Sequence, residues 1–180
     1  MKTLIVPFAI TLLLATSCTS NQAPTTISDS AAVATKTAAD NKRVMEEKNK
    51  ATALASAEGF NTHSVDQIFK DFTPDMIDYG DGSGPAIKGK DSIKFLMKDF
   101  FTAFPDMKGE NLTALADGNK VAVFADWSGT FKGAFMGRKP TNKPFKFKDA
   151  DFYTFNDAGQ IIEHRSVQSM ANFWTQVGAK

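Results

Sequence analysis

Few residues in this chain have the types and spacing that chemistry requires. The sequence of 180 residues contains one cysteine, Cys18, and two histidines, His63 and His164. Nucleophilic catalysis needs a serine or cysteine held beside a base, and neither histidine has such a partner in motif spacing. One cysteine and two histidines also cannot make an ordinary zinc site. The sequence therefore predicts no metal ion, and it leaves the carboxylates and His164 as candidate acids and bases.

Three titratable residues on two neighbouring predicted strands are the candidates for acid–base work: Asp151, Glu163 and His164. Groups of this kind transfer protons without a cofactor. Because residues two apart on a strand share a face, Glu163 lines up with Arg165 and Ser169, and His164 falls on the opposite face. A buried Arg165 would need an acid, which could be Glu163, Asp151 or an anionic ligand.

Two features argue against nucleotide and nucleic-acid binding. Residues 84–91 (GPAIKGKD) nearly spell the phosphate-binding P-loop, but Asp91 replaces the hydroxyl that holds magnesium. The charges are balanced, with 21 Lys and Arg against 20 Asp and Glu. The chain therefore lacks the excess positive charge with which proteins bind nucleic acid without sequence preference. We therefore expect no cofactor and no nucleic-acid partner.

The N-terminus is typical of an export signal. Lys2 precedes an apolar run over residues 4–15, which is shorter than the roughly 20 residues that a bilayer span needs. Small residues lead to Cys18, and this arrangement resembles a bacterial lipoprotein signal. We predict a signal peptide over residues 1–17, then lipidated Cys18 and a flexible tether over residues 18–41, then one domain over residues 42–180. The predicted location is the bacterial cell envelope, lipid-anchored, at the outer membrane and facing the periplasm.

The hydrophobic period changes along the domain. Helical spacing is expected over residues 42–58, 64–73, 91–104 and 171–177, and alternation predicts strands over residues 76–79, 108–117, 120–131, 144–156 and 160–169. This order predicts an α+β fold whose long sheet curls and leaves a pocket at its mouth. The 16 Phe residues indicate either a thick aromatic core or an aromatic-lined cavity.

The stretch over residues 129–143, GTFKGAFMGRKPTNK, resembles the G-T-H-x-G-x-F-x-G-x-x-P-T-G-K run of the SnoaL-like polyketide cyclases, within the nuclear transport factor 2-like superfamily. Three other segments also resemble the family, and all of them occur in the same order as in the family: AFPD at 103–106, GNKVA at 118–122 and DAGQIIEH at 157–164. The resemblance implies a cone-shaped barrel, in which a curved and mostly antiparallel sheet packs on three N-terminal helices around a hydrophobic pocket.

Three positions depart from the family's pattern. Phe131 stands where the family has a histidine, Ser169 stands at its acid/base aspartate, and Tyr79 stands at an early histidine. Serine has no suitable pKa for moving a proton beside a carbonyl. The resemblance therefore implies that the catalytic set is not kept, and that Tyr79, Trp127, Phe131, Arg165 and Ser169 line a ligand pocket.

Three functions remain open at this point. The first is a membrane-tethered lipoprotein that binds a small, mostly apolar or weakly anionic ligand. The second is a cofactor-independent cyclase or isomerase, with its acid/base relocated to Asp151, Glu163 or His164. The third is a protein-interaction module that forms a homodimer through its sheet. We favour the first, and so expect a binding protein rather than an enzyme.

Overall fold

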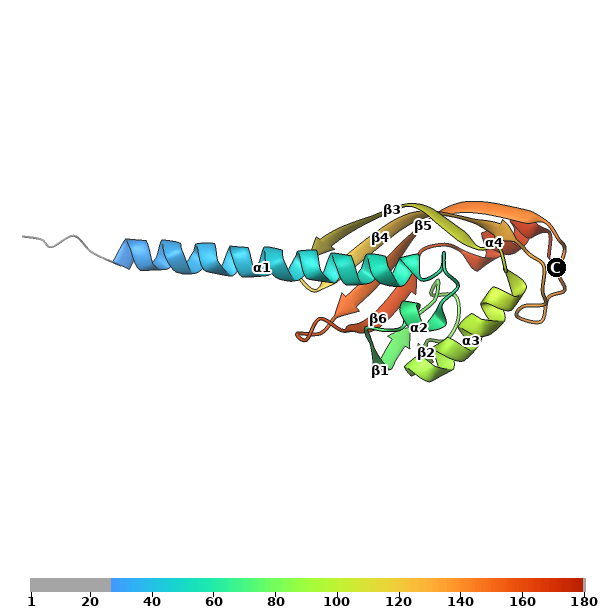
Figure 1. Cartoon of the computed structure of the whole chain (residues 1–180), viewed down its shortest axis with the longest axis horizontal. Coiled ribbons are helices and arrows are strands. Elements are labelled where there is room, and N and C mark those ends of the chain that lie inside the picture. Colours follow the sequence, from blue (N-terminus) through green and yellow to red (C-terminus); the bar gives the residue numbers. More distant parts are fainter. Residues whose placement is uncertain (1–26, 180) are drawn as a thin grey trace, which may run out of the picture. The chain divides into compact units, whose positions relative to one another are not determined.

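A computed structural model describes residues 27–179 of the chain, with side chains from residue 31 (Figure 1). The predicted signal peptide and Cys18 lie outside the described residues. The helices are α1 (Ile27–Glu58), α2 (Val65–Ile68), α3 (Lys90–Ala103) and α4 (Met170–Val177). The strands are β1 (Phe72–Asp78), β2 (Ile87–Lys88), β3 (Lys108–Asp117), β4 (Lys120–Thr130), β5 (Pro144–Phe155) and β6 (Ile161–Ser166). No helix in this part of the chain is long and apolar enough to cross a bilayer.

Helix α1 begins earlier than the sequence suggested. Residues 27–41 belong to the predicted flexible tether, but they are helical. Alanine is the best helix former, and this segment is rich in it, so it can be helical without a wide apolar face. By backbone contacts the chain divides into two units, Met1–Lys36 and Thr37–Lys180, and the second holds the sheet and its helices.

The shorter elements follow from local signals. Ser64 caps α2 as expected, because its hydroxyl accepts a hydrogen bond from the Gln67 N–H at 3.2 Å. This helix ends at Ile68 rather than near residue 73, since β1 already begins at Phe72. The long strands β3 to β6 agree with the prediction to within a few residues, whereas the two-residue β2 was not predicted.

The six strands form one curved, unclosed sheet in the order β2-β1-β6-β5-β4-β3 (Figure 1). All neighbours are antiparallel except β1 and β6, which run parallel. The C-terminal half of α1 packs on one face of the sheet with α2 and α3, as its buried Ala53 and Ala57 indicate. This is the α+β arrangement of the nuclear transport factor 2-like cone.

A β-bulge changes the orientation of β6. Thr154 pairs with Glu163, but the next residue of β5, Phe155, pairs with Ile161. Ile162 is therefore an extra residue, and the alternation of inner and outer side chains reverses across it. As a result Ile161 and His164 both point to the helix-covered face of the sheet, although their numbers differ by three.

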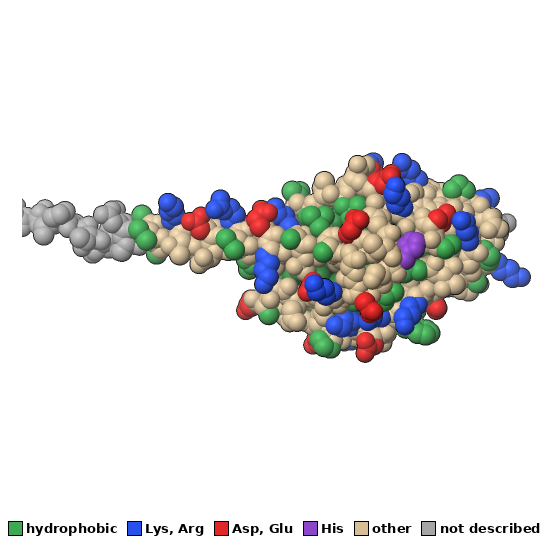
Figure 2. All heavy atoms as spheres, viewed as in Figure 1, with side chains coloured by type: hydrophobic (Ala, Val, Ile, Leu, Met, Phe, Trp, Pro, Cys, Tyr) green, Lys and Arg blue, Asp and Glu red, His purple; other side chains and the backbone are tan. Residues whose placement is uncertain are grey.

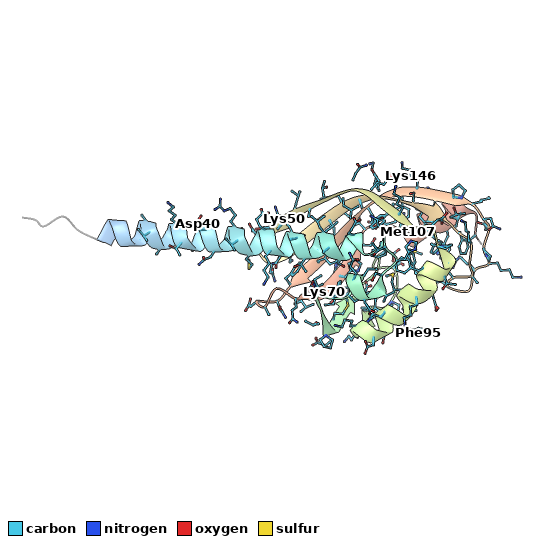
Figure 3. The ribbon with its side chains drawn as sticks, viewed as in Figure 1. Asp40, Lys50, Lys70, Phe95, Met107 and Lys146 are labelled. Atoms are coloured by element: carbon cyan, nitrogen blue, oxygen red, sulfur yellow. The ribbon has the colours of Figure 1, made fainter. Side chains whose placement is uncertain are left out.

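Most of the described phenylalanines pack into the core rather than lining a large cavity. One cluster of buried residues, between α3, α4 and the sheet, holds Ala103, Phe104, Met107, Ala125, Trp127, Phe131, Phe145, Phe173, Trp174 and Val177. Its rings meet edge to face or stacked, for example Phe104 and Phe131 with centroids 5.4 Å apart. Figure 3 shows Met107 inside this part of the molecule, while Phe95 lies on the outer side of α3. The cone is thus largely filled with its own side chains.

Candidate functional site

The most unusual group of side chains joins three strands of the sheet. His164 on β6 lies between two carboxylates, with its Nδ1 3.1 Å from Asp78 Oδ1 on β1 and its Nε2 3.1 Å from Asp151 Oδ1 on β5. The side chains of Asp78, Asp151 and His164 are only 19%, 13% and 20% exposed. We call these three residues the Asp–His–Asp group.

Strand pairing explains how this group assembles. His164 pairs directly with Asp78 in the parallel β1–β6 register and with Tyr153 in the antiparallel β5–β6 register. The expectation that His164 faces away from the interior was wrong, because it assumed unbroken alternation along β6. The bulge at Ile162 reverses that alternation.

The electrostatics of the group favour a charged imidazole. Burial by itself lowers the pKa of His164, but hydrogen bonds and charges from Asp151 and Asp78 outweigh burial and raise the pKa to about 10. Burial also acts to raise the pKa of Asp78, yet the His164 hydrogen bond and charge, with the Gly80 N–H, hold it below its usual value. Near neutral pH the imidazole of His164 is therefore protonated, and Asp78 is a carboxylate.

A further carboxylate, Asp149, lies next to this group. Its oxygens accept hydrogen bonds from the Ser166 hydroxyl at 2.6 Å and from the Gln168 N–H at 2.9 Å. Burial, and then the charge of Asp151, raise the pKa of Asp149. Asp149 thus adds negative potential at the point where β6 leaves the sheet.

Two members of the Asp–His–Asp group border a small cavity. His164 and Asp78 line it, together with Ser56, Phe60, Ile68, Phe69, Phe72, Met76, Met97 and Tyr153. The volume is about 30 Å³, and a water needs roughly 10–15 Å³ of such space. Burial raises the pKa of Tyr153 well above its ordinary value, so its phenol stays protonated. The site is therefore a narrow apolar space with a polar, negatively charged end.

The residues predicted to line a pocket are not brought together at this cavity. Trp127 is 3% exposed and Phe131 is fully buried, and both belong to the aromatic core. Ser169 is the N-cap residue of α4, without a side-chain capping bond. Trp127 and Phe131 are therefore core residues, and Ser169 marks the start of α4.

The remaining predicted residues lie on the other face of the sheet. Arg165 is exposed, and its guanidinium lies 4.6 Å from the centre of the Tyr79 ring. The Tyr79 hydroxyl donates to Glu163 at 3.4 Å. Arg165 therefore meets an aromatic ring rather than the acid that we expected. Of the three fallback acid–base residues, Asp151 and His164 are joined, and Glu163 is separated from them by the sheet.

Asp78, Tyr153 and Asp149 were missed from the sequence. Asp78 had a usable signal, because it lies two residues after Met76 on a predicted strand and so shares the face of a core residue. We did not include it among the candidate acids and bases. Among the described residues, no group of three or more His, Cys, Asp or Glu is arranged to hold a metal ion.

Comparison with known proteins defines the class. The sequence profile of the SnoaL-like polyketide cyclases matches residues 50–177, and the chain belongs to this family. No curated protein matches the chain.

Similar solved structures agree with this class. AclR from Streptomyces galilaeus, named as a hydroxylase, is 27% identical with a TM-score of 0.63, and the match covers 74% of this chain and 97% of AclR. A protein from Jannaschia sp. CCS1, named as a SnoaL-like polyketide cyclase, is 25% identical with a TM-score of 0.62, and the match covers 74% and 93% of the two chains. IdmH from Streptomyces antibioticus, at 22% identity and a TM-score of 0.59, shares the fold; that match covers 72% and 98%.

Proposed function

We propose that this domain binds a small, mostly apolar molecule whose polar end donates a hydrogen bond to the Asp–His–Asp group. The observation that carries the proposal is the position of Asp78 and His164 in the wall of an otherwise apolar cavity. Both imidazole nitrogens already face carboxylates, so the group offers acceptor oxygens and negative charge. A hydroxyl or amine suits this end better than the weakly anionic group that we expected when Arg165 was assigned to the pocket.

The cavity must widen for such a ligand. A volume of about 30 Å³ is well below the roughly 300 Å³ at which ligand pockets begin. Two of the lining residues are methionines, Met76 and Met97, whose unbranched side chains change shape at low cost. We propose that Met97, which is only partly buried on α3, moves when the ligand enters.

The same arrangement favours a second candidate, proton transfer of the cyclase or isomerase type. Asp78 is the cavity-lining carboxylate, so it would accept a proton from a carbon beside a carbonyl and return it to another atom of the substrate. His164 cannot serve as the base while both its nitrogens donate to carboxylates. Asp151, outside the lining, would act as a positioning residue. This activity would need no cofactor, and Asp78 would take the role of the family's aspartate, at whose position the family resemblance puts Ser169.

A defined pair of probes tests the binding proposal. Phenol and benzoate share a ring, but phenol carries a donor and benzoate carries a negative charge. In the full chain, we expect phenol to shift the His164 ring signals in NMR saturably, and benzoate to leave them unchanged. Asp78→Asn should weaken the phenol response, while Glu163→Gln, on the other face of the sheet, should preserve it. Equal binding of both probes, or a phenol response that survives Asp78→Asn, would contradict the proposal.

We further propose that the chain is a lipoprotein, anchored through Cys18 to the outer membrane and facing the periplasm. The support is the sequence of the first eighteen residues, with the only cysteine at the position that lipidation requires. On the face drawn in Figure 2, Lys and Arg side chains lie among Asp and Glu side chains rather than in one basic patch.

We also propose a homodimer through the outer face of the sheet. Three large hydrophobic side chains are exposed there: Leu115 at 67%, Phe124 at 42% and Phe152 at 41%. They lie on neighbouring strands, since Ala122 pairs with both Leu115 and Phe152. An apolar area of this kind on adjacent strands supports association with a second sheet.

A further inference from the structure

A buried amide on α1 has no hydrogen-bond partner. Asn49 is 1% exposed, and neither its Nδ2 nor its Oδ1 meets a donor or acceptor among the described residues. Buried polar groups are satisfied in the great majority of cases, and each orphaned group opposes folding. Asn49 therefore needs an explanation that the protein's own described atoms do not supply.

Asn49 belongs to the lining of a pocket distinct from the cavity at His164. The pocket has a volume of about 240 Å³ and is bordered by Asn41, Val44, Met45, Lys48, Asn49, Asp157 and Gly159. It lies between α1 and the turn that joins β5 to β6. The volume exceeds by more than tenfold the roughly 10–15 Å³ that one water needs, so the space suits a small organic group.

Gly159 leaves this space open. It has φ +75°, a conformation that L side chains rarely adopt. A Cβ at this position would lie 3.7 Å from Asn49 Oδ1 and 3.3 Å from Lys48 Nζ. The missing side chain leaves room for a ligand to approach Asn49. The two polar atoms of Asn49 are covered in the free protein, so a ligand reaches them only when a covering group such as the exposed Lys48 side chain shifts.

We propose that this pocket binds a neutral amide group. Asn49 offers one donor and one acceptor side by side, and an amide presents the complementary pair. The rim carries one cation, Lys48, and one anion, Asp157, so neither sign of ligand charge is favoured. Val44 and Met45 add apolar surface for the carbon atoms beside the amide.

The same chain already shows this recognition between its own residues. Asn61 donates from Nδ2 to the Gly109 carbonyl at 3.0 Å and accepts from the Gly109 N–H at 2.7 Å. One asparagine side chain therefore forms hydrogen bonds with both the N–H and the C=O of a single backbone residue. Asn49 has the same groups without the partner, and either a polypeptide backbone or a small free amide can supply it.

The test is a titration of the full chain with two probes, N-methylacetamide and an Ala-Ala-Ala tripeptide with acetyl and amide caps. The readout is the side-chain NH₂ signal of Asn49, assigned by its loss in Asn49→Leu. Saturable shifts of this signal support the site. Tighter binding of the tripeptide identifies polypeptide backbone as the source, and equal or weaker binding identifies a small amide.

Stability of the free protein gives an independent check, with Asn61→Leu as the matched control. If the Asn49 amide is a ligand site, Asn49→Leu removes two unsatisfied groups and raises the melting temperature. Asn61→Leu breaks three formed side-chain hydrogen bonds, two with Gly109 and one with Glu58, and lowers it. A lower melting temperature for Asn49→Leu, or probe shifts elsewhere in the pocket that persist in that variant, would overturn the proposal. So would a long-lived water on the Asn49 amide with no response to either probe.

Discussion

Replacing His164 by Gln should destabilise the protein in a pH-dependent way. The folded-state pKa of His164 is about 10, above the roughly 6.5 of an unfolded histidine. A raised pKa stabilises the folded state fully below the unfolded value, and this contribution is lost as the pH rises toward 10. Between pH 7 and pH 9 the folded state keeps its proton while the unfolded state has released it. Each pH unit in this window therefore removes just over ~1 kcal/mol, which is on the order of 2–3 kcal/mol over two units.

The assay is urea unfolding of wild type and His164→Gln at pH 7 and pH 9. The wild type should lose on the order of 2–3 kcal/mol more stability than the variant over this interval. His63→Gln is the matched control, because His63 Nε2 contacts the Met107 carbonyl rather than a carboxylate. The control should follow the wild type. A constant difference between wild type and His164→Gln at both pH values would refute the assignment of His164 as an imidazolium held by two carboxylates.

Three other predictions concern the core, the anchor and the sheet face. Phe131→Ala should lower stability by about 3–5 kcal/mol in urea unfolding, since this fully buried ring packs on Phe104 and Trp174; a cost below 1 kcal/mol would contradict the aromatic core. Cys18→Ala should move the protein from the membrane fraction to the soluble fraction, and continued membrane association would oppose the lipoprotein proposal. Phe124→Lys should shift a dimer to monomer in sedimentation without loss of the folded state, and an unchanged mass would oppose the sheet-face dimer.

Much of the fold was predictable because its signals are local. Strict alternation defined the long strands, and β3 and the start of β5 fall at the predicted residues. Ser64 predicted the start of α2 through its capping side chain. The helical segment over residues 27–41 was not predicted, because we weighed its lack of large apolar residues above the helix propensity of alanine.

The candidate site was harder to predict, because it depends on non-local geometry. His164 and Asp151 were both candidates, but a bulge at Ile162, visible only in the strand pairing, decides which face His164 occupies. The family resemblance led to Arg165 and Ser169, and neither lies at the cavity. Asp78 joins the group through the parallel pairing of β1 with β6, across 86 positions of sequence, which no local pattern reveals.

Native mass spectrometry of the full chain, purified from the cells that make it, tests the central claim most directly. The account predicts a discrete added mass on the wild type that is lost in Asp78→Asn and retained in Glu163→Gln, since only Asp78 borders the cavity. An added mass that survives Asp78→Asn, or a wild type and Glu163→Gln that both carry none, would contradict a ligand held by the Asp–His–Asp group.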